Sequence, residues 1–221
     1  MAIWDFLQVY GVQIARGTLV TCAQFLTATM VALVVALFVG LGKLSTNALI
    51  RGVSVIYIEL FRGTSLLVQV FWIFFVLPLF GLTLSPFTAG FLSVGLNIGA
   101  YGAELVRGAI QSIPRGQWEA ATAISLSPAR RMRRIILPQA FSIMLPPWGN
   151  LLIELLKSTA IVSLISVKDL MFQAKQVNSL AYIPIQAFGI ALIIYYILAR
   201  AAITPLVRWL EHSMAQRQGR V

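Results

Sequence analysis

Charged residues are scarce in this chain of 221 residues, and acidic residues are the scarcest charged type. Asp, Glu, Lys and Arg together make up 11% of the sequence, whereas 59% of the residues are hydrophobic. Soluble domains typically contain about 25% charged residues. So small a charged fraction cannot cover a soluble surface, and the composition therefore indicates an integral membrane protein.

Cysteine and histidine are almost absent. The chain has a single cysteine, Cys22, and a single histidine, His212. One cysteine can form neither an internal disulfide nor a multi-cysteine metal site. Cys22 lies inside an apolar run, where a small buried residue is expected, and His212 stands in a polar tail. The sequence therefore predicts no metal site, no catalytic group and no resident cofactor.

The net charge is +10 because basic residues outnumber acidic ones, 17 to 7. In a soluble domain this excess would suggest a nucleic-acid partner. Here the basic residues are interleaved with long apolar runs and form no separate basic face, so we expect no nucleic acid to bind. In a membrane protein the same excess is typical of positively charged cytoplasmic loops.

Five apolar runs are long enough to cross a membrane, which takes about 20 residues. We expect spans at about 18–41, 52–75, 87–106, 139–156 and 185–206. The first 17 residues lack the basic start of a signal peptide and place apolar residues at helical spacing, which predicts an interfacial helix over 1–17. Without repeats or low-complexity tracts, residues 1–221 are expected to form one all-α domain.

Lys and Arg are unevenly distributed between these runs. They are concentrated after the first and third runs and in the C-terminal tail, and none lies between the second and third. The stretch after the fourth run carries three lysines, partly offset by Asp169. Because cytoplasmic segments carry the excess of Lys and Arg, the N-terminus is expected outside and the C-terminus in the cytoplasm.

Two adjacent prolines, Pro146 and Pro147, fall within the fourth run. A proline inside a helix removes a backbone hydrogen bond, which predicts a kinked or broken helix. Broken helices are tolerated at membrane depth only where protein or a watery cavity satisfies the freed backbone groups. The sequence therefore places the fourth span at the functional centre of the molecule.

A short basic segment, residues 115–138, separates the third and fourth runs and has four arginines within five residues. Residues 118–124 favour a short helix with Glu119 near its N-terminus, and Pro128 can begin a second one. The segment is therefore expected to be a helical hairpin on the cytoplasmic side. A loop that only sets topology and touches anionic lipid is the alternative, but it needs neither a hairpin nor a packing residue such as Trp118.

Several motifs carry a family resemblance. Glu119-Ala120-Ala121 is followed at the expected distance by Ile135-Ile136-Leu137-Pro138, and this pattern resembles the cytoplasmic loop of bacterial ABC importer permeases. Ser125 stands where the family has glycine. Other stretches resemble the polar amino acid branch of these permeases: Glu59 to Thr64, Gln69, Ala100 to Glu104 with Arg107-Gly108, and Ile113 to Trp118. The resemblance covers residues 15 to 210, roughly.

The resemblance implies five transmembrane helices in the type I ABC importer permease fold, with a cytoplasmic coupling-helix hairpin. It further implies a multi-pass subunit of the bacterial cytoplasmic (inner) membrane that contacts lipid, two ATPase subunits that use ATP and Mg²⁺, a second permease, identical or paralogous, and an extracytoplasmic solute-binding protein. The chain itself is expected not to be an enzyme, because the glycines around Lys43 do not complete a P-loop.

The resemblance assigns the hairpin to coupling with the ATPase. The residues expected to take part are Arg115, Trp118, Glu119, Ala120, Ala121, Ile124, Ser125, Leu137 and Pro138. If the turn requires a positive φ at Ser125, serine costs about 1 kcal/mol relative to glycine. Alternatively, Pro128 shapes the turn.

Ionisable residues at membrane depth are costly and indicate pairing or function. Glu59 and Arg62 are spaced i, i+3 in the second span, and Glu104 and Arg107 have the same spacing at the end of the third. We interpret both as structural ion pairs, with gating as the alternative role.

Glu154 and Lys157 repeat this spacing at the end of the fourth span, and Ser158 and Thr159 follow. The pair could bind the ammonium and carboxylate of a zwitterion, or it could be structural. The polar amino acid branch often has aspartate where this chain has Ser158. The absence of that negative charge favours a net-neutral zwitterion over a cation as the substrate. The chain also resembles the ectoine or hydroxyectoine uptake subgroup. Side chains that could add hydrogen bonds in the substrate path are Gln69, Asn97 and Tyr101.

Two other functions stay open at this point. A stand-alone secondary transporter or channel subunit would need its own coupling-ion site, and five spans do not divide into two inverted repeats. A non-transporting scaffold would use the basic segment only to bind lipid.

Overall fold

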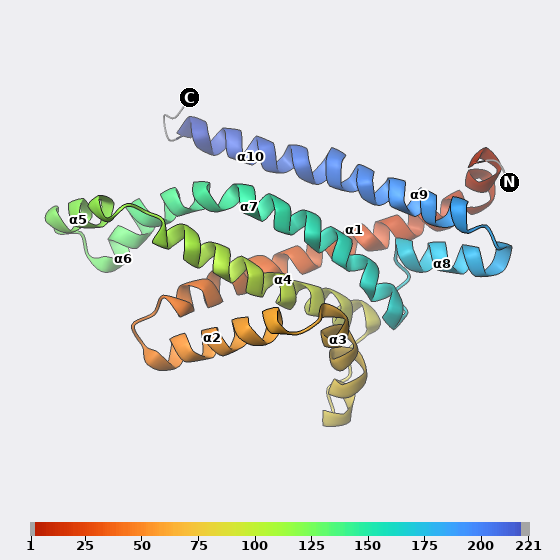
Figure 1. The fold of residues 1–221 in the computed structure, drawn as a ribbon, viewed down its shortest axis with the longest axis horizontal. Coiled ribbons are helices and arrows are strands. Elements are labelled where there is room, and N and C mark those ends of the chain that lie inside the picture. Colours follow the sequence, from red (N-terminus) through yellow and green to blue (C-terminus); the bar gives the residue numbers. More distant parts are fainter. Residues whose placement is uncertain (1–2, 218–221) are drawn as a thin grey trace.

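The computed structural model describes residues 3–217, and every regular element within that range is a helix (Figure 1). This confirms the all-α class that the sequence predicted. Four helices of this part are long and apolar enough to cross a membrane, and the α2–α3 pair makes a fifth if its halves count as one span. The long helices lie along one another, with α4 packed on α1, α7 on α4 and α10 on α7.

Helix α1 (Ile3–Lys43) is a single helix of 41 residues. At 1.5 Å per residue it is about 60 Å long, twice the thickness of the hydrocarbon core. The predicted interfacial segment 1–17 therefore continues directly into the first predicted span, and residues 1–2 lie outside the described range. Phe6 and Ile14 are buried against α8 and α9, so one face of this segment is covered by protein.

Small residues bring α1 and α4 (Pro86–Gln111) close together. A Cβ atom on Gly95 would lie 2.9 Å from the carbonyl oxygen of Ala28, and one on Gly99 would lie 2.9 Å from Val35. Small residues are typical of helix contacts in membranes because they let backbones approach closely. The contact fixes α4 as the central helix, between α1 and α7.

The predicted second span is split in the structure. Helix α2 (Ala48–Gly63) ends at an extended pair, Thr64 and Ser65, and α3 (Leu66–Phe71) begins there at 106° to it. The helical path continues from α3 as a π-helical turn, Trp72–Val76, and a 3-10 helix, Leu77–Phe80. The sequence did not predict this break.

Helix α7 (Leu137–Ser158) runs through Pro146 and Pro147 without a break. The expectation was a kinked or broken helix at these prolines. The break is wrong, and the kink stays a prediction. Trp148 and Gly149, which follow them, are buried, and a Cβ on Gly149 would lie 2.7 Å from Val207 of α10. Packing of α7 between α4 and α10 keeps the segment helical where two backbone donors are missing.

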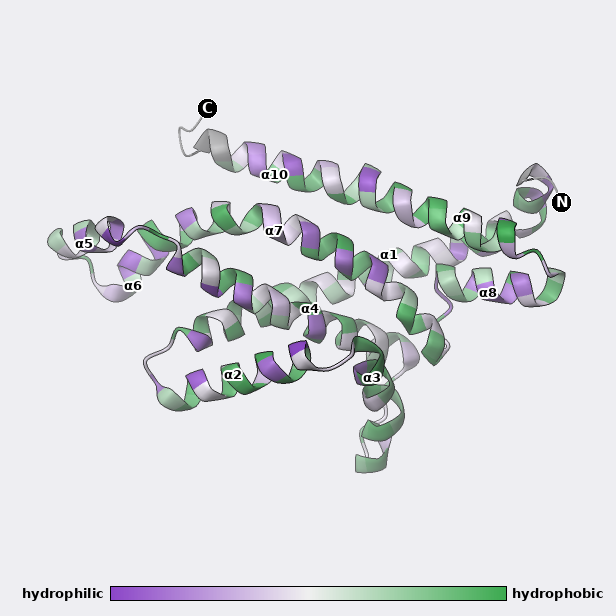
Figure 2. Cartoon of the chain, in the orientation of Figure 1, coloured by the Kyte–Doolittle hydropathy of each residue, from purple (hydrophilic) through white to green (hydrophobic). Residues whose placement is uncertain are grey.

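The remaining elements form the two ends of the molecule and the C-terminal helices that run along it (Figure 1). They are α5 (Arg115–Ala123), α6 (Pro128–Arg131), the π-helical turn Met132–Ile136, the 3-10 helix Thr159–Ile165, α8 (Leu170–Ala181), α9 (Pro184–Ile197), the π-helical turn Leu198–Ile203 and α10 (Thr204–Arg217). Helices α5 and α6 form one end, which we call the hairpin end. The N-terminus of α1, α8 and the start of α9 form the opposite end. Hydrophilic residues gather in α5 and α6, whereas the long helices are largely hydrophobic (Figure 2).

Candidate functional site

The hairpin turn depends on a left-handed residue. Ser125 has φ +57°, the amide of Ser125 donates to the carbonyl of Thr122 (2.9 Å), and the amide of Leu126 donates to that of Ala121 (3.2 Å). This pair of bonds is the Schellman closure of a helix C-terminus, in which glycine is preferred at the left-handed position. The positive φ considered for Ser125 from the sequence is therefore present.

Inside the hairpin, Arg131 braces the first helix. Its guanidinium lies 5.8 Å from the ring centroid of Trp118 and donates to the hydroxyl of Thr122. Ala121 is buried beneath this contact. One of the four clustered arginines is thus part of the hairpin's internal structure, a role that spacing alone did not indicate.

The expected coupling residues divide into two groups. Ala121 is buried, and Trp118 and Leu137 are half-buried, so these three hold the hairpin together. The residues that are exposed are Arg115, Glu119, Ala120, Ile124, Ser125 and Pro138. Ile124 is 68% exposed at the tip of the molecule. A large apolar side chain in that position, with charged neighbours, forms a surface suited to a protein partner.

At the base of the hairpin, Glu104 joins two helices. Its carboxylate accepts from Arg107 (2.7 Å), the i, i+3 partner that the sequence predicted, and also from Lys43 at the end of α1. The Lys43 contact was missed because 61 residues separate the partners. The available signal was that both residues end spans at the same membrane face. Whether this cluster also gates transport stays a prediction.

The predicted pair in α2 does not form. Glu59 and Arg62 are exposed, and the structure shows no ion pair between them. The Arg62 guanidinium instead lies over the ring of Tyr101, 5.1 Å from its centroid. The sequence interpretation of this pair as an ion pair is therefore wrong, because Arg62 turns toward α4.

Two predicted substrate-path residues hold the break between α2 and α3. The side-chain amide of Gln69 donates to the carbonyl of Phe61 (2.9 Å) and to the hydroxyl of Thr64 (2.7 Å). The amide of Asn97 donates to the same Phe61 carbonyl (3.0 Å) and to the Gln69 side-chain oxygen (3.0 Å). The backbone groups freed by the break thus find partners within the protein, as membrane depth requires.

A cavity of about 540 Å³ opens between this break, α4 and α7. Its polar lining consists of Thr64, Ser65, Asn97, Tyr101, Glu154 and Ser158, and its apolar lining of Leu66, Ile98, Leu151 and Ile161. The structure thereby brings together four residues of the predicted substrate path, from helices far apart in the sequence.

Three other predicted residues lie outside this cavity. Lys157 is exposed and does not line it, and Glu154 forms no ion pair with it in the described part of the chain. The hydroxyl of buried Thr159 donates to the Leu156 carbonyl. Gln69 lines a neighbouring, mostly apolar groove.

Groups for both charges of a zwitterion lie in the cavity or next to it. Glu154 lines the cavity, and its carboxylate forms no ion pair within residues 3–217. Arg62 does not line the cavity, but its guanidinium lies 5.1 Å from the ring centroid of Tyr101, which does. Ser65 does not cap α3 with its side chain, and Ser65 and Leu66 line the cavity, so the first turn of α3 lies beside it.

A polar cavity at a helix break between apolar helices, with an ordered hairpin at one end of the molecule, fits a component of a membrane transport system. The comparison with family models agrees. The chain belongs to the family of binding-protein-dependent transport system inner membrane components, whose model matches residues 22–216. This confirms the permease resemblance seen in the sequence.

Individual relatives cover most of the chain. It is 43% identical to the probable amino-acid ABC transporter permease protein y4tF of Sinorhizobium fredii, over 90% of this chain and 89% of that protein. It is 36% identical to the L-cystine transport system permease protein TcyB of Bacillus subtilis, over 80% and 76%.

Solved structures share the fold. The structure described as "Crystal structure of an amino acid ABC transporter with histidines" matches with a TM-score of 0.88 and 34% identity, over 96% of this chain and 99% of that one. An inward-facing MetNI methionine ABC transporter matches with a TM-score of 0.73 at 21% identity, over 90% and 96%, and shows the fold alone. The type I permease fold expected from the sequence is thus confirmed.

Proposed function

We propose that this chain is the permease subunit of an ATP-driven importer of a polar amino acid or an amino-acid-like zwitterion, with ectoine and hydroxyectoine among the candidate substrates. The cavity between the α2–α3 break and Glu154 carries this proposal, since Glu154 lines it and the Arg62 guanidinium lies over Tyr101, another of its lining residues. The names of the relatives support the substrate class, because they refer to amino acids and cystine.

In the proposed binding mode, the substrate ammonium contacts Glu154. Its carboxylate contacts the first-turn amides of α3 and, at the border of the cavity, Arg62. The sequence suggested Lys157 as the cation that binds the substrate carboxylate. In this binding mode Arg62 takes that role. Asn97, Tyr101 and Ser158 would orient the substrate, and the opposite charges of Glu154 and the neighbouring Arg62 together suit a net-neutral solute.

The proposed partners follow from the hairpin and the family. Two ATPase subunits bind ATP and Mg²⁺ and carry out all hydrolysis, and this chain contributes no ATPase site. The exposed surface around Glu119 and Ile124 docks on an ATPase subunit, and Glu104 with its two cations ties the hairpin base to α1. A second permease, identical or paralogous, and an extracytoplasmic binding protein complete the complex.

The proposed location is the bacterial cytoplasmic (inner) membrane, with the hairpin and the C-terminus in the cytoplasm and the N-terminus outside. The hairpin and the C-terminal end of α10 lie at the same end of the molecule, as this topology requires (Figure 1). The arginines of α6 and its π-helical continuation agree with the positive-inside rule.

Uptake into vesicles tests the proposal. The chain is reconstituted with its ATPase, and accumulation of labelled amino acids, ectoine and hydroxyectoine is measured with loaded binding protein, with and without internal ATP. We expect accumulation only with ATP and binding protein. Uptake that survives without ATP but collapses with an ion gradient would make the chain a secondary transporter instead.

A further inference from the structure

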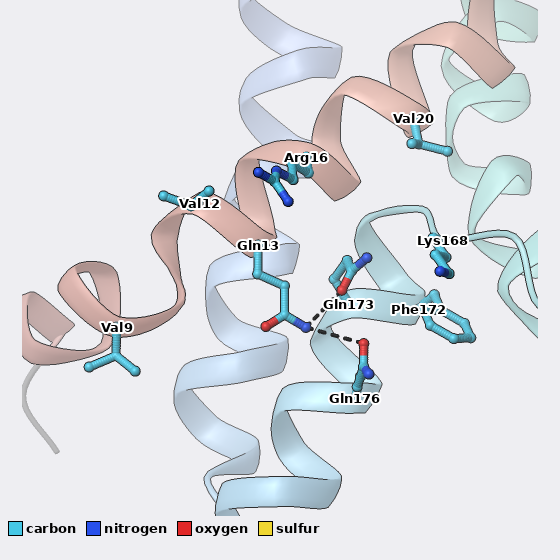
Figure 3. A pocket seen from close by; sticks show the side chains of 9 residues that line it. All are labelled: Val9, Val12, Gln13, Arg16, Val20, Lys168, Phe172, Gln173 and Gln176. Carbon is cyan, nitrogen blue, oxygen red and sulfur yellow. Dashed lines mark hydrogen bonds between the residues drawn. The ribbon is translucent and has the colours of Figure 1, made fainter.

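A second cavity lies at the end of the molecule opposite the hairpin. It has a volume of about 650 Å³ and is formed by the outer part of α1 and the start of α8 (Figure 3). Its lining combines two cations, three amides and four apolar side chains: Arg16, Lys168, Gln13, Gln173, Gln176, Val9, Val12, Val20 and Phe172. The transport cavity and the coupling hairpin use none of these residues.

The two cations of this pocket are not neutralised by the protein. Arg16 and Lys168 are exposed, and neither forms an ion pair with a residue that the structure describes. The neighbouring Asp169 is fully buried, caps α8 by accepting from the amide of Phe172, and receives the hydroxyl of Tyr195. No carboxylate lines the pocket, so it is a site of net positive charge.

Two of the three glutamines in the lining keep free donors. The side-chain amide of Gln13 donates to the oxygens of Gln173 (2.7 Å) and Gln176 (3.2 Å), as Figure 3 shows. With both oxygens directed at Gln13, the NH₂ groups of Gln173 and Gln176 are left as donors. Two cations and two amide donors together match the oxygens of a phosphate group.

The surroundings of these donors are apolar. Val9 and Val12 line the pocket and are 62% and 68% exposed, and Leu19 on the same helix is 69% exposed. An isolated phosphate gains nothing from such a surface, and an acidic protein loop gains little. A phospholipid uses both parts, because its headgroup meets the cations and its acyl chain covers the valines.

Topology does not explain these cations. The positive-inside rule accounts for arginines in the hairpin but disfavours Arg and Lys at the opposite end. Arg16 and Lys168 nevertheless lie together there, next to the first predicted span. We propose that the pocket binds the phosphate headgroup of an anionic phospholipid from the leaflet opposite the hairpin, with an acyl chain along Val9, Val12 and Val20. The bound lipid would join α1 to α8 across the glutamine cluster.

Lipid retention measured by native mass spectrometry tests this proposal. The full chain is purified, stripped of lipid and incubated with equal amounts of phosphatidylglycerol and phosphatidylcholine that carry identical acyl chains. We expect the wild type to retain phosphatidylglycerol preferentially. The double substitution Arg16→Gln with Lys168→Gln should reduce this preference by roughly tenfold or more, since each cation near an anionic lipid contributes to its attraction. Lys175→Gln is the matched control, because Lys175 is on α8 but does not line the pocket.

Three outcomes would overturn the proposal, provided the variants elute and melt like the wild type. Equal retention of the two lipids by the wild type would show that the pocket does not select an anionic headgroup. Displacement by inorganic phosphate alone, with no lipid requirement, would assign it to a free anion. An unchanged lipid preference in the double variant, together with lost stimulation by the binding protein, would make the pocket a protein-docking surface.

Discussion

Two helices at the centre of this protein behave in opposite ways. The path from α2 to α3 bends by 106° with no proline at the bend, whereas α7 contains two adjacent prolines and stays helical. The prolines alone predict the reverse, although Gly63, Thr64 and Ser65 at the bend are residue types that commonly end or begin helices. The position of a break in a buried helix is therefore decided by the neighbouring groups as well as by the residues at the break.

At the bend, side chains replace the missing helical hydrogen bonds. Gln69 and Asn97 both donate to the Phe61 carbonyl, and Gln69 also reaches Thr64. In α7, buried side chains on either side of the prolines pack against α4 and α10. The break thus places Thr64, Ser65 and Leu66 in the lining of the cavity, while the unbroken α7 contributes Glu154 to it.

Removing the negative charge that α7 contributes to the cavity should have the largest effect on uptake. Glu154→Gln keeps the shape but removes the negative charge, so a bound ammonium loses a charge-assisted hydrogen bond, which is worth about 1.5–3 kcal/mol. We expect ATP-driven uptake at limiting substrate to fall by about 10- to 100-fold. Initial rates of uptake in vesicles measure this.

Two substitutions, Lys157→Gln and Arg62→Gln, show which of these cations binds the substrate carboxylate. Because Lys157 lies outside the cavity, its substitution should leave uptake near the wild-type rate, whereas Arg62→Gln should weaken it. If Lys157→Gln is as damaging as Glu154→Gln and Arg62→Gln is silent, the pairing suggested by the sequence is right.

The next effect concerns the side-chain clamp at the bend, which consists of Gln69 and Asn97 and their hydrogen bonds, and it is an effect on stability. Gln69→Ala removes the donor to the Phe61 carbonyl and to Thr64 and the acceptor of the Asn97 amide, which should cost about 1–3 kcal/mol of stability. Thermal unfolding in detergent measures the loss, with exposed Gln8→Ala as the control. An unchanged midpoint for Gln69→Ala would mean that the bend does not depend on the clamp.

The sequence predicted the elements of this fold better than their breaks. Hydropathy located α1, α4, α7 and α9–α10, and the spacing of Glu104 and Arg107 predicted their contact. It could not locate the α2–α3 bend, because Asn97 comes from a helix more than 30 residues away and its partners are backbone carbonyls. For the same reason Arg62 was assigned to Glu59, its neighbour on the helix, although it lies over Tyr101.

Substitutions at the tightly packed part of α7 should have an intermediate effect on stability. Gly149→Ala would put a Cβ 2.7 Å from Val207 and should destabilise the protein by about 2 kcal/mol through overpacking. Pro146→Ala should change stability by less than about 1 kcal/mol, because the helix is already formed there. Unfolding midpoints of the two variants test this order, and a larger loss for the proline variant would contradict the role given to packing.

The smallest effect concerns the hairpin turn, where neither a clamp nor dense packing is present. Ser125 is exposed and has φ +57°, so Ser125→Gly should remove local strain and stabilise the hairpin by about 0.5–1 kcal/mol. Hydrogen exchange of the amides of Ser125 and Leu126, which close the turn, would slow accordingly. Ser127→Gly is the matched control, because φ is −61° there and glycine offers no relief. Faster exchange in Ser125→Gly would show that the serine side chain stabilises the turn by a contact that outweighs its backbone strain.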